Sequence, residues 1–221
     1  MKRDVQTSLL EGMERPIGAI LPSVFVGSNA DLMAAVAPLY LSGSVLDVTY
    51  GRGRWWDRFR PDPFVFHDLA LDGVDFAALP EADRSFDTVT FDPPYVHSGG
   101  RGTNGCEDFH DRYGLGYRRW PGNRLYDLIL GGLLDCCRVG SKWVLVKCME
   151  YAQGGEFHDI PTLVTNAARE AGWIKHDQIV HFTGTGPGGW NIYTVKRARR
   201  AHSYLIVLSP DNPHYGREEM T

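Results

Sequence analysis

Residues 45–53 read VLDVTYGRG, an apolar run that leads into a tight Gly-x-Gly turn. Two further apolar runs, FVF at 64–66 and TVTF at 88–91, also end in polar turns, which is typical of buried parallel strands. Segments with the apolar spacing of helices alternate with these runs. The predicted elements are helices at 29–41, at 124–137 and between Pro161 and Gly172, and strands at 45–48, 64–66, 88–91, 143–146, 178–182 and 203–208. This alternation predicts an α/β domain with a mainly parallel sheet, whose ligands bind at the carboxyl ends of the strands.

Composition limits the classes of protein to which the chain can belong. Its 221 residues are 43% hydrophobic, which is enough for one domain with a sizeable core. The formal charge of -4 excludes attraction of the whole molecule to nucleic acid or an anionic membrane, so an anionic partner needs a local basic patch. We predict a single domain over 1–221, with a flexible loop at about 96–123 and a disordered tail at about 209–221.

The sequence contains no pattern typical of targeting, membrane insertion or metal binding. The N-terminus lacks the apolar run of a secretory signal, and no stretch approaches the roughly 20 apolar residues of a membrane span. The cysteines, Cys106, Cys136, Cys137 and Cys148, form no C-x-x-C pair, so we expect structural thiols and no metal. A soluble cytoplasmic protein without a membrane partner is the resulting expectation.

The segment Asp92-Pro93-Pro94-Tyr95 directly follows the strand that ends at Phe91. The two prolines fix two φ angles and remove two amide donors, so the turn is rigid and presents carbonyl oxygens. Asp92 adds a carboxylate acceptor, and Tyr95 adds an aromatic face. Together they suit a planar group with an exocyclic amine, which donates to the acceptors while its ring stacks on Tyr95. A nucleobase fits that description, although Asp-Pro-Pro also occurs in ordinary turns.

This segment resembles the [DNS]-P-P-[YFW] signature of the amino-methyltransferases, which use S-adenosyl-L-methionine to methylate exocyclic nitrogens of adenine or cytosine. The match lies at a strand end with Asp87 opening that strand, as in the family, and the turn at 49–53 resembles the family's first Gly-rich loop. The resemblance implies the Rossmann-like class I methyltransferase fold, with a mostly parallel seven-stranded sheet and flanking helices. It also implies that Asp92, Pro93, Pro94 and Tyr95 are catalytic.

The same resemblance implies a binding site for S-adenosyl-L-methionine. Asp47 would reach the ammonium group of the cofactor, Asp68 its ribose hydroxyls and Asp75 its adenine amine, although the last two equally suit exposed loop acids. Phe25 lies in a segment that resembles the one closing over the cofactor's methionine end, and it equally suits the core. The full set implied is Phe25, Asp47, Thr49, Tyr50, Gly51, Gly53, Asp68, Asp75 and Phe76. Only six residues separate Asp68 from Asp75, so the helix that usually intervenes must be missing or reduced to a turn.

Two basic segments are candidates for contact with nucleic acid, and both equally suit solvated surfaces. One lies in the loop after Tyr95, and the other precedes the last strand. The candidate residues are Arg118, Arg119, Lys196, Arg197, Arg199 and Arg200. Two G-x-G-x-x-G matches, at 100–105 and 184–189, do not clearly open a helix within a βαβ unit, so neither indicates a dinucleotide site.

The leading hypothesis is therefore a methyltransferase that acts on the N6 amine of adenine in DNA, of the small phage or bacterial type. Asp at the first position of the motif favours adenine over cytosine within the family. An RNA methyltransferase acting on adenine N6 or guanine N2 is the alternative within enzymes. An inactive cofactor-binding partner subunit and a Rossmann oxidoreductase are the remaining alternatives, which the intact motif and the poor context of the G-x-G-x-x-G matches disfavour.

Overall fold

The computed structural model describes residues 21–94, 122–153, 156–183 and 201–211. Its helices are α1 (Asn29–Tyr40), the short 3-10 helix η2 (Arg54–Trp56), α3 (Gly122–Val139) and α4 (Ile160–Glu170). Its strands are β1 (Val24–Val26), β2 (Val45–Asp47), β3 (Phe64–Phe66), β4 (Phe86–Phe91), β5 (Gly140–Cys148), β6 (Tyr151–Gln153), β7 (Glu156–His158), β8 (Trp173–Phe182) and β9 (Ser203–Pro210).

Seven of these strands form one sheet in the order β1-β8-β9-β5-β4-β2-β3. The pairs β1 and β8, β2 and β3, β2 and β4, and β4 and β5 are parallel, whereas β9 runs antiparallel to both β5 and β8. After β5 the chain forms a separate antiparallel hairpin from β6 and β7. The predicted α/β fold with a mostly parallel seven-stranded sheet is confirmed.

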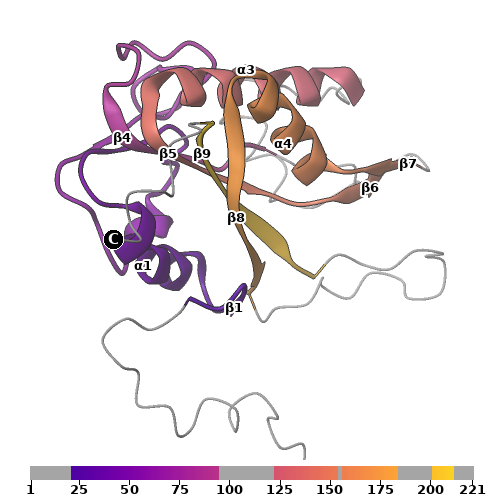
Figure 1. Cartoon of the computed structure of the whole chain (residues 1–221), viewed down its shortest axis with the longest axis horizontal. Coiled ribbons are helices and arrows are strands. Elements are labelled where there is room, and N and C mark those ends of the chain that lie inside the picture. The colour runs from indigo at the N-terminus through magenta and orange to yellow at the C-terminus, as the bar shows by residue number, and fades with distance from the viewer. Residues whose placement is uncertain (1–20, 95–121, 154–155, 184–200, 212–221) are drawn as a thin grey trace, which may run out of the picture.

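Helices cover both faces of the sheet, with α1 on one side and α3 and α4 on the other (Figure 1). Met33 of α1 shares its core with Leu145 of β5, and Ile129 of α3 and Val164 of α4 share the opposite core with Val146. Because side chains alternate along a strand, β5 supplies both cores, and each buried aliphatic side chain contributes about 1.5–3 kcal/mol. No helix in the described ranges is long and apolar enough to cross a membrane.

Local sequence signals place the helix ends. Ser28 caps α1, because its Oγ accepts from the amide of Asp31 at 3.1 Å while the Asp31 carboxylate accepts from the Ser28 amide at 3.1 Å. Pro38 lies in the last turn of α1, which ends at Tyr40. Gly172, just past α4, has φ +78°, a conformation that favours glycine at a helix end. These helices therefore follow the predicted boundaries closely.

Several elements differ from the sequence prediction. Helix α3 begins at Gly122, inside the loop predicted at 96–123, and β9 extends to Pro210, inside the tail predicted from residue 209. Strand β9 reaches this far because β8 begins at Trp173, earlier than predicted, and pairs Ile174 with Ser209. The short strands β1, β6 and β7 were not predicted. Between β3 and β4 the chain forms turns, as expected from the short spacing.

The described cysteines, Cys136, Cys137 and Cys148, are buried free thiols, and Cys106 lies outside the described residues. Burial raises the pKa of the Cys137 thiol to about 12, so this side chain stays protonated and behaves as a small apolar group. The expectation of structural thiols agrees with these positions.

Two adjacent glycines of α3 provide a test of the packing between this helix and the sheet. A Cβ at Gly132 would lie 2.6 Å from both Phe76 and Phe91, whereas a Cβ at Gly131 would lie 3.4 Å from that of Ala77. We expect Gly132→Ala to lower the free energy of unfolding by about 1–3 kcal/mol through overpacking. Gly131→Ala should leave it unchanged or raise it by up to about 1 kcal/mol through helix propensity. Urea unfolding of both variants checks this, and equal effects would contradict the packing described.

Candidate active site

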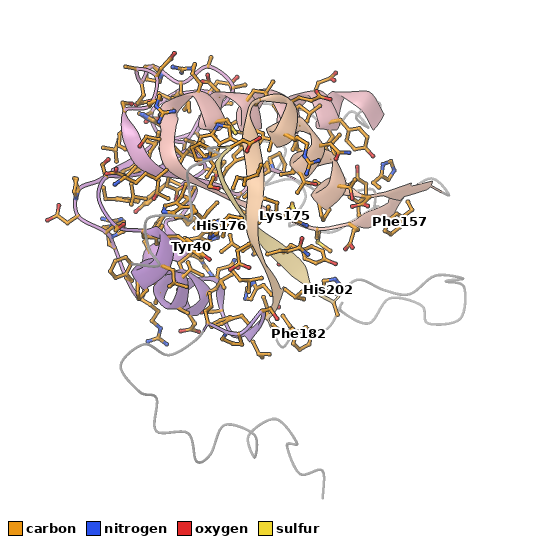
Figure 2. All side chains as sticks on the ribbon, viewed as in Figure 1. Tyr40, Phe157, Lys175, His176, Phe182 and His202 are labelled. Atoms are coloured by element: carbon orange, nitrogen blue, oxygen red, sulfur yellow. The ribbon has the colours of Figure 1, made fainter. Side chains whose placement is uncertain are left out.

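Four ionisable side chains lie at the carboxyl ends of neighbouring strands and form what we call the polar row: Asp47, Asp92, Lys147 and His181. Strands β2, β4 and β5 are parallel, and β8 runs in the same direction as β5 because β9 is antiparallel to both. Their carboxyl ends therefore meet at one edge of the sheet. Figure 2 shows Phe182 and His202 at this edge, where β8 ends and β9 begins.

Alternation along the strands places the polar row on the α1 side of the sheet. Val45, Leu145 and Ile179 belong to the core under α1, and each stands two residues before a member of the row. Phe91 and Val146, directly opposite each other in β4 and β5, belong to the core on the other side. Their successors, Asp92 and Lys147, are thus neighbours that face α1.

Asp92 carries a carboxylate oxygen that has no hydrogen-bond partner among the described residues. Its Oδ1 is buried and accepts no hydrogen bond from the part of the chain that the structure describes, while its amide donates to Thr49 Oγ1 at 2.8 Å. Burial raises the pKa of Asp92 to about 6, and the charge of Lys147 opposes that rise. The carboxylate is therefore ionised at neutral pH, with acceptor capacity unused.

The two residues that follow are consistent with a rigid turn. Pro93 and Pro94 are buried directly after β4, as the sequence predicted for a clamp at a strand end. Tyr95, the last member of the motif, lies outside the described residues.

Asp47 fixes the Gly-rich turn through hydrogen bonds to its carboxylate. Its Oδ1 accepts from the Thr49 amide at 3.0 Å, and its Oδ2 accepts from Trp56 Nε1 at 2.7 Å. Burial raises the pKa of Asp47 to about 6, the two hydrogen bonds oppose the rise, and the charge of Asp92 adds to it. Both carboxylate oxygens thus hold the protein's own groups, so contact between Asp47 and a cofactor ammonium stays a prediction.

The turn after β2 has backbone conformations that favour glycine. Gly51 has φ +56° and Gly53 has φ +68°, and a Cβ at Gly53 would lie 2.5 Å from the Tyr50 ring. Tyr50 in turn stacks on Phe66, with ring centroids 4.0 Å apart. Asp68 completes the arrangement, because its Oδ2 accepts from the Gly51 amide at 2.8 Å. The predicted residues Thr49, Tyr50, Gly51, Gly53 and Asp68 are therefore brought together.

Asp75, Phe76 and Phe25, the other predicted cofactor contacts, lie in different surroundings. Asp75 is exposed and accepts from the Ala77 amide at 2.9 Å, as the first residue of a turn. Phe76 is buried, with its ring 5.2 Å from that of Phe91. Phe25 is half-buried on β1, with its ring 6.0 Å from that of His181. Their contact with a cofactor stays a prediction, and Phe76 serves the core in any case.

Sequence reasoning missed two members of the polar row and the α1 residue that binds one of them. Lys147 is 3% exposed, and its Nζ donates to Oδ1 of Asn29, the first residue of α1, at 2.7 Å. His181 is fully buried, with Nε2 2.9 Å from the Gly27 carbonyl oxygen and Nδ1 unpartnered among the described groups. Burial lowers the pKa of His181, which is consistent with a neutral ring that donates from Nε2. The available signal was a lysine directly after the apolar run at 143–146.

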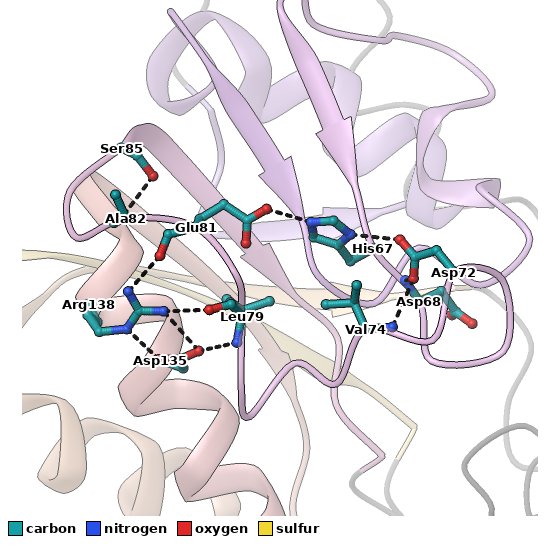
Figure 3. Close-up of polar contacts among 10 residues, drawn as sticks. All are labelled: His67, Asp68, Asp72, Val74, Leu79, Glu81, Ala82, Ser85, Asp135 and Arg138. Atoms are coloured by element: carbon teal, nitrogen blue, oxygen red, sulfur yellow. Dashed lines mark hydrogen bonds and ion pairs between the residues drawn. The ribbon is translucent and has the colours of Figure 1, made fainter.

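A second network fastens the loop between β3 and β4 (Figure 3). The guanidinium of Arg138 on α3 donates to the carbonyls of Leu79 and Glu81 at 2.9 and 2.7 Å and pairs with Asp135 at 2.6 Å. Asp135 also accepts from the Leu79 amide at 2.6 Å. The loop is thereby tied to α3 by charge-assisted hydrogen bonds.

His67 lies between two carboxylates of this loop. Its Nδ1 is 2.7 Å from Asp72 Oδ2, and its Nε2 is 2.6 Å from Glu81 Oε1. A neutral imidazole carries only one N–H, so both bonds are made only by the protonated ring. Burial lowers the pKa of His67, but the hydrogen bonds to the two carboxylates outweigh this and raise it.

The predicted nucleic-acid contacts Arg118, Arg119, Lys196, Arg197, Arg199 and Arg200, and both G-x-G-x-x-G matches, lie outside the described residues. Within the described ranges, no group of three or more His, Cys, Asp or Glu side chains is arranged to hold a metal ion.

Comparison with known proteins supports the fold and little beyond it. No protein-family model matches the sequence, and no curated protein matches it. A protein assigned as a methyltransferase, from the Haloferax volcanii complex with the Trm112 methyltransferase activator, aligns with a TM-score of 0.51 at 12% identity, over 85% of this chain and 90% of that chain.

Two other solved structures align less closely. A protein assigned as an RNA methyltransferase from Pyrococcus horikoshii gives a TM-score of 0.47 at 12% identity, over 82% of both chains. A protein assigned as a DNA modification methylase from Thermus thermophilus gives 0.37 at 8% identity, over 86% of this chain and 53% of that chain. This chain thus spans about half the length of the methylase. The fold of the chain is that of the Rossmann-like methyltransferases.

The contacts of His67 with Asp72 and Glu81 predict that this side chain makes a pH-dependent contribution to stability. Because the pKa of folded His67 is raised, its contribution is complete below the unfolded value of about 6.5 and is lost as pH rises through the folded value. We expect His67→Gln to lower the free energy of unfolding more at pH 6 than at pH 9, as measured by urea unfolding. A difference between the two proteins that does not change with pH would show that the ring is not protonated.

Proposed function

We propose that this protein is an S-adenosyl-L-methionine-dependent methyltransferase that transfers a methyl group to the exocyclic N6 of adenine in DNA. The observation that carries the proposal is the Asp92 carboxylate, which holds a buried acceptor without a partner in the described structure, immediately before Pro93 and Pro94. It stands at the end of β4, a central strand of a methyltransferase fold, where ligands of such sheets bind.

The described residues fit the proposed cofactor by their chemistry. Asp47 and Asp68 gather at the ends of β2 and β3 around the Gly51 turn, where carboxylates suit an ammonium group and ribose hydroxyls. Thr49, Tyr50, Gly53, Asp75, Phe76 and Phe25 complete the proposed set of contacts. When bound, S-adenosyl-L-methionine supplies an electrophilic methyl group on a sulfonium. The likeness to the Haloferax methyltransferase adds support for this class of enzyme.

The chain's own residues act on the target amine. The lone pair of an adenine amine is delocalised into the ring, so the amine is a weak nucleophile. Hydrogen bonds from the amine to the Asp92 carboxylate and the Pro93 carbonyl localise that lone pair and orient it. Ionised Asp92 is a stronger acceptor than the neutral acid, and its pKa of about 6 predicts activity that rises with pH through this value.

The target base reaches this turn only outside a duplex stack. A base in a duplex has its amine paired, so the base must be flipped out or the substrate must be single-stranded, with Tyr95 replacing the lost stacking. The proposed contacts with the nucleic-acid backbone are Arg118, Arg119, Lys196, Arg197, Arg199 and Arg200, which meet the need of an acidic chain for a local basic patch.

Expression in a host that lacks adenine methylation tests the proposal. Host DNA and RNA are digested separately to nucleosides and analysed by mass spectrometry, for the wild type, Asp92→Ala and the control Asp127→Asn, which changes an exposed acid of α3. We expect N6-methyladenine in DNA from the wild type and the control, and its loss from Asp92→Ala by at least about 100-fold.

The other outcomes separate the alternatives. A methylated nucleoside in RNA alone would replace the proposal with an RNA methyltransferase. Adenine methylation that persists in Asp92→Ala would remove Asp92 from the mechanism. No methylated nucleoside in either pool would favour a cofactor-binding partner subunit without activity.

Asp92 also predicts a conflict between activity and stability. Its folded pKa is raised, so the folded state favours the neutral acid, and ionisation destabilises it as pH rises from about 4 through about 6. We expect Asp92→Asn to lower methyl transfer, because a neutral amide oxygen is a weaker acceptor than a carboxylate, and to raise the free energy of unfolding at pH 7 by about 1–2 kcal/mol. Urea unfolding at pH 4.5 and 7 checks this, since the gain should shrink at the lower pH. A less stable variant at pH 7 would contradict it.

A further inference from the structure

Lys147 is a buried cation whose hydrogen-bonding capacity is only partly used by the described residues. Its ammonium has three N–H donors, and one of them reaches Asn29 Oδ1 at 2.7 Å. Its Nζ also lies 5.9 Å from the centroid of the Trp55 ring, in η2 after the Gly-rich turn. With only 3% of the residue exposed, bulk water contributes little to its solvation. A buried ammonium held in this way is costly unless its remaining donors serve a ligand.

Asp92 complements Lys147, because its carboxylate is an acceptor and the Lys147 ammonium is a donor. Its Oδ1 is a buried acceptor that takes no donor from the described residues. Phe91 pairs with Val146, so the next residues of the two strands, Asp92 and Lys147, are neighbours on the α1 side. Their charges interact: Lys147 lowers the pKa of Asp92, and Asp92 raises that of Lys147 against the effect of burial. No ion pair joins the two side chains in the described part of the chain. An acceptor oxygen of Asp92 and donor groups of Lys147 therefore lie on neighbouring strands without hydrogen bonds to described residues.

The groups facing this pair come from every neighbouring element of the site. Asp47 of β2 adds a negative charge near Asp92, and His181 of β8 is neutral, while Cys148, the next residue of β5, lies on the opposite face of the sheet as a protonated thiol. The side-chain oxygen of Asn29 of α1 accepts from Lys147, which leaves two N–H groups of the ammonium without a hydrogen bond to the described residues. Lys147 is therefore the cation of the polar row.

We propose that Asp92 and Lys147 together read the edge of the target base, with Asp92 accepting from the exocyclic amine and Lys147 donating to the adjacent ring nitrogen. This inference rests on the proposed function and specifies its base selectivity. Adenine presents the N6 amine beside N1, an acceptor, which matches the pair. Cytosine presents N4 beside N3 in the same pattern. Guanine presents the N2 amine beside N1–H, a donor that would face the ammonium, while its other neighbour, N3, is crowded by the sugar.

Substitution of one atom in the substrate tests this reading. The substrates are unmethylated single-stranded oligonucleotides with the sequence that the enzyme methylates. The target position carries either adenine or 1-deazaadenine, which has C–H in place of N1. The proteins are the full-length wild type, Lys147→Met, Lys147→Arg and the control Lys142→Met, which changes an exposed lysine of the same strand. Thermal unfolding verifies that each variant folds.

The informative quantity is the ratio of kcat/KM for adenine to that for 1-deazaadenine, compared between proteins. Intrinsic differences in amine reactivity cancel in this comparison, as in a double-mutant cycle. We expect the ratio to fall by about 10-fold or more in Lys147→Met, because a hydrogen bond from a charged donor is lost. Lys142→Met should keep the wild-type ratio, and Lys147→Arg should keep most of it because the charge and donors remain.

Three results would overturn the inference. One is an unchanged ratio in Lys147→Met. Another is a Lys147→Met effect that is equal for both bases and accompanied by weaker binding of S-adenosyl-L-methionine in calorimetry, which would assign the cation to the cofactor's carboxylate. The third is methylation of guanine N2 in the same sequence context by the wild type. A wild type that methylates no adenine in DNA would instead refute the proposed function, so the two failures are distinguishable.

Discussion

Burial of charge at the ends of parallel strands is the constraint on which the rest of the structure depends. Strands β2, β4 and β5 lie between two helical layers. The residues at their carboxyl ends are therefore surrounded by protein and have little contact with water. Asp47 meets this constraint with two donors from its own turn, at 3.0 and 2.7 Å. Asp92 and Lys147 do not meet it fully. Polar groups left unsatisfied in a folded protein cost free energy, and such costs concentrate where a ligand binds.

A network of hydrogen bonds and ion pairs fixes the loops around the buried charges of Asp92 and Lys147. Asp68 ties the Gly-rich turn to the end of β3 through the Gly51 amide. Arg138 ties the next loop to α3, and His67 bridges two carboxylates of that loop. These bonds are charge-assisted, so they fix loop geometry that apolar packing alone would leave loose. The proposed contact of its acceptors with a small planar base needs that rigidity.

Much of the fold could be predicted because its signals are local. The apolar runs, the Ser28 cap and the glycine after α4 depend on neighbours within a few residues. The same is true of Asp92, which was found through the adjacent prolines. Lys147 gave only the signal of a lysine after an apolar run, and His181 gave none, because the role of each depends on strands that are distant in sequence. Phe76 shows a related limit of local signals: its segment resembles one that lies along a cofactor, but its packing against Phe91 became visible only in the tertiary structure.

The sequence by itself therefore determined the α/β pattern, the rigid Asp-Pro-Pro turn and the acidic strand ends, since each is encoded by residue type and short spacing. Only the tertiary structure decided the strand order, which inserts β9 between β5 and β8 and brings α1 over the carboxyl edge. That order brought the Lys147 ammonium to Asn29, 118 residues away in sequence, and within charge interaction of Asp92. The physical reason is that strand register and burial are cooperative properties of the whole core, and the electrostatics of a buried group depend on neighbours that local sequence does not specify.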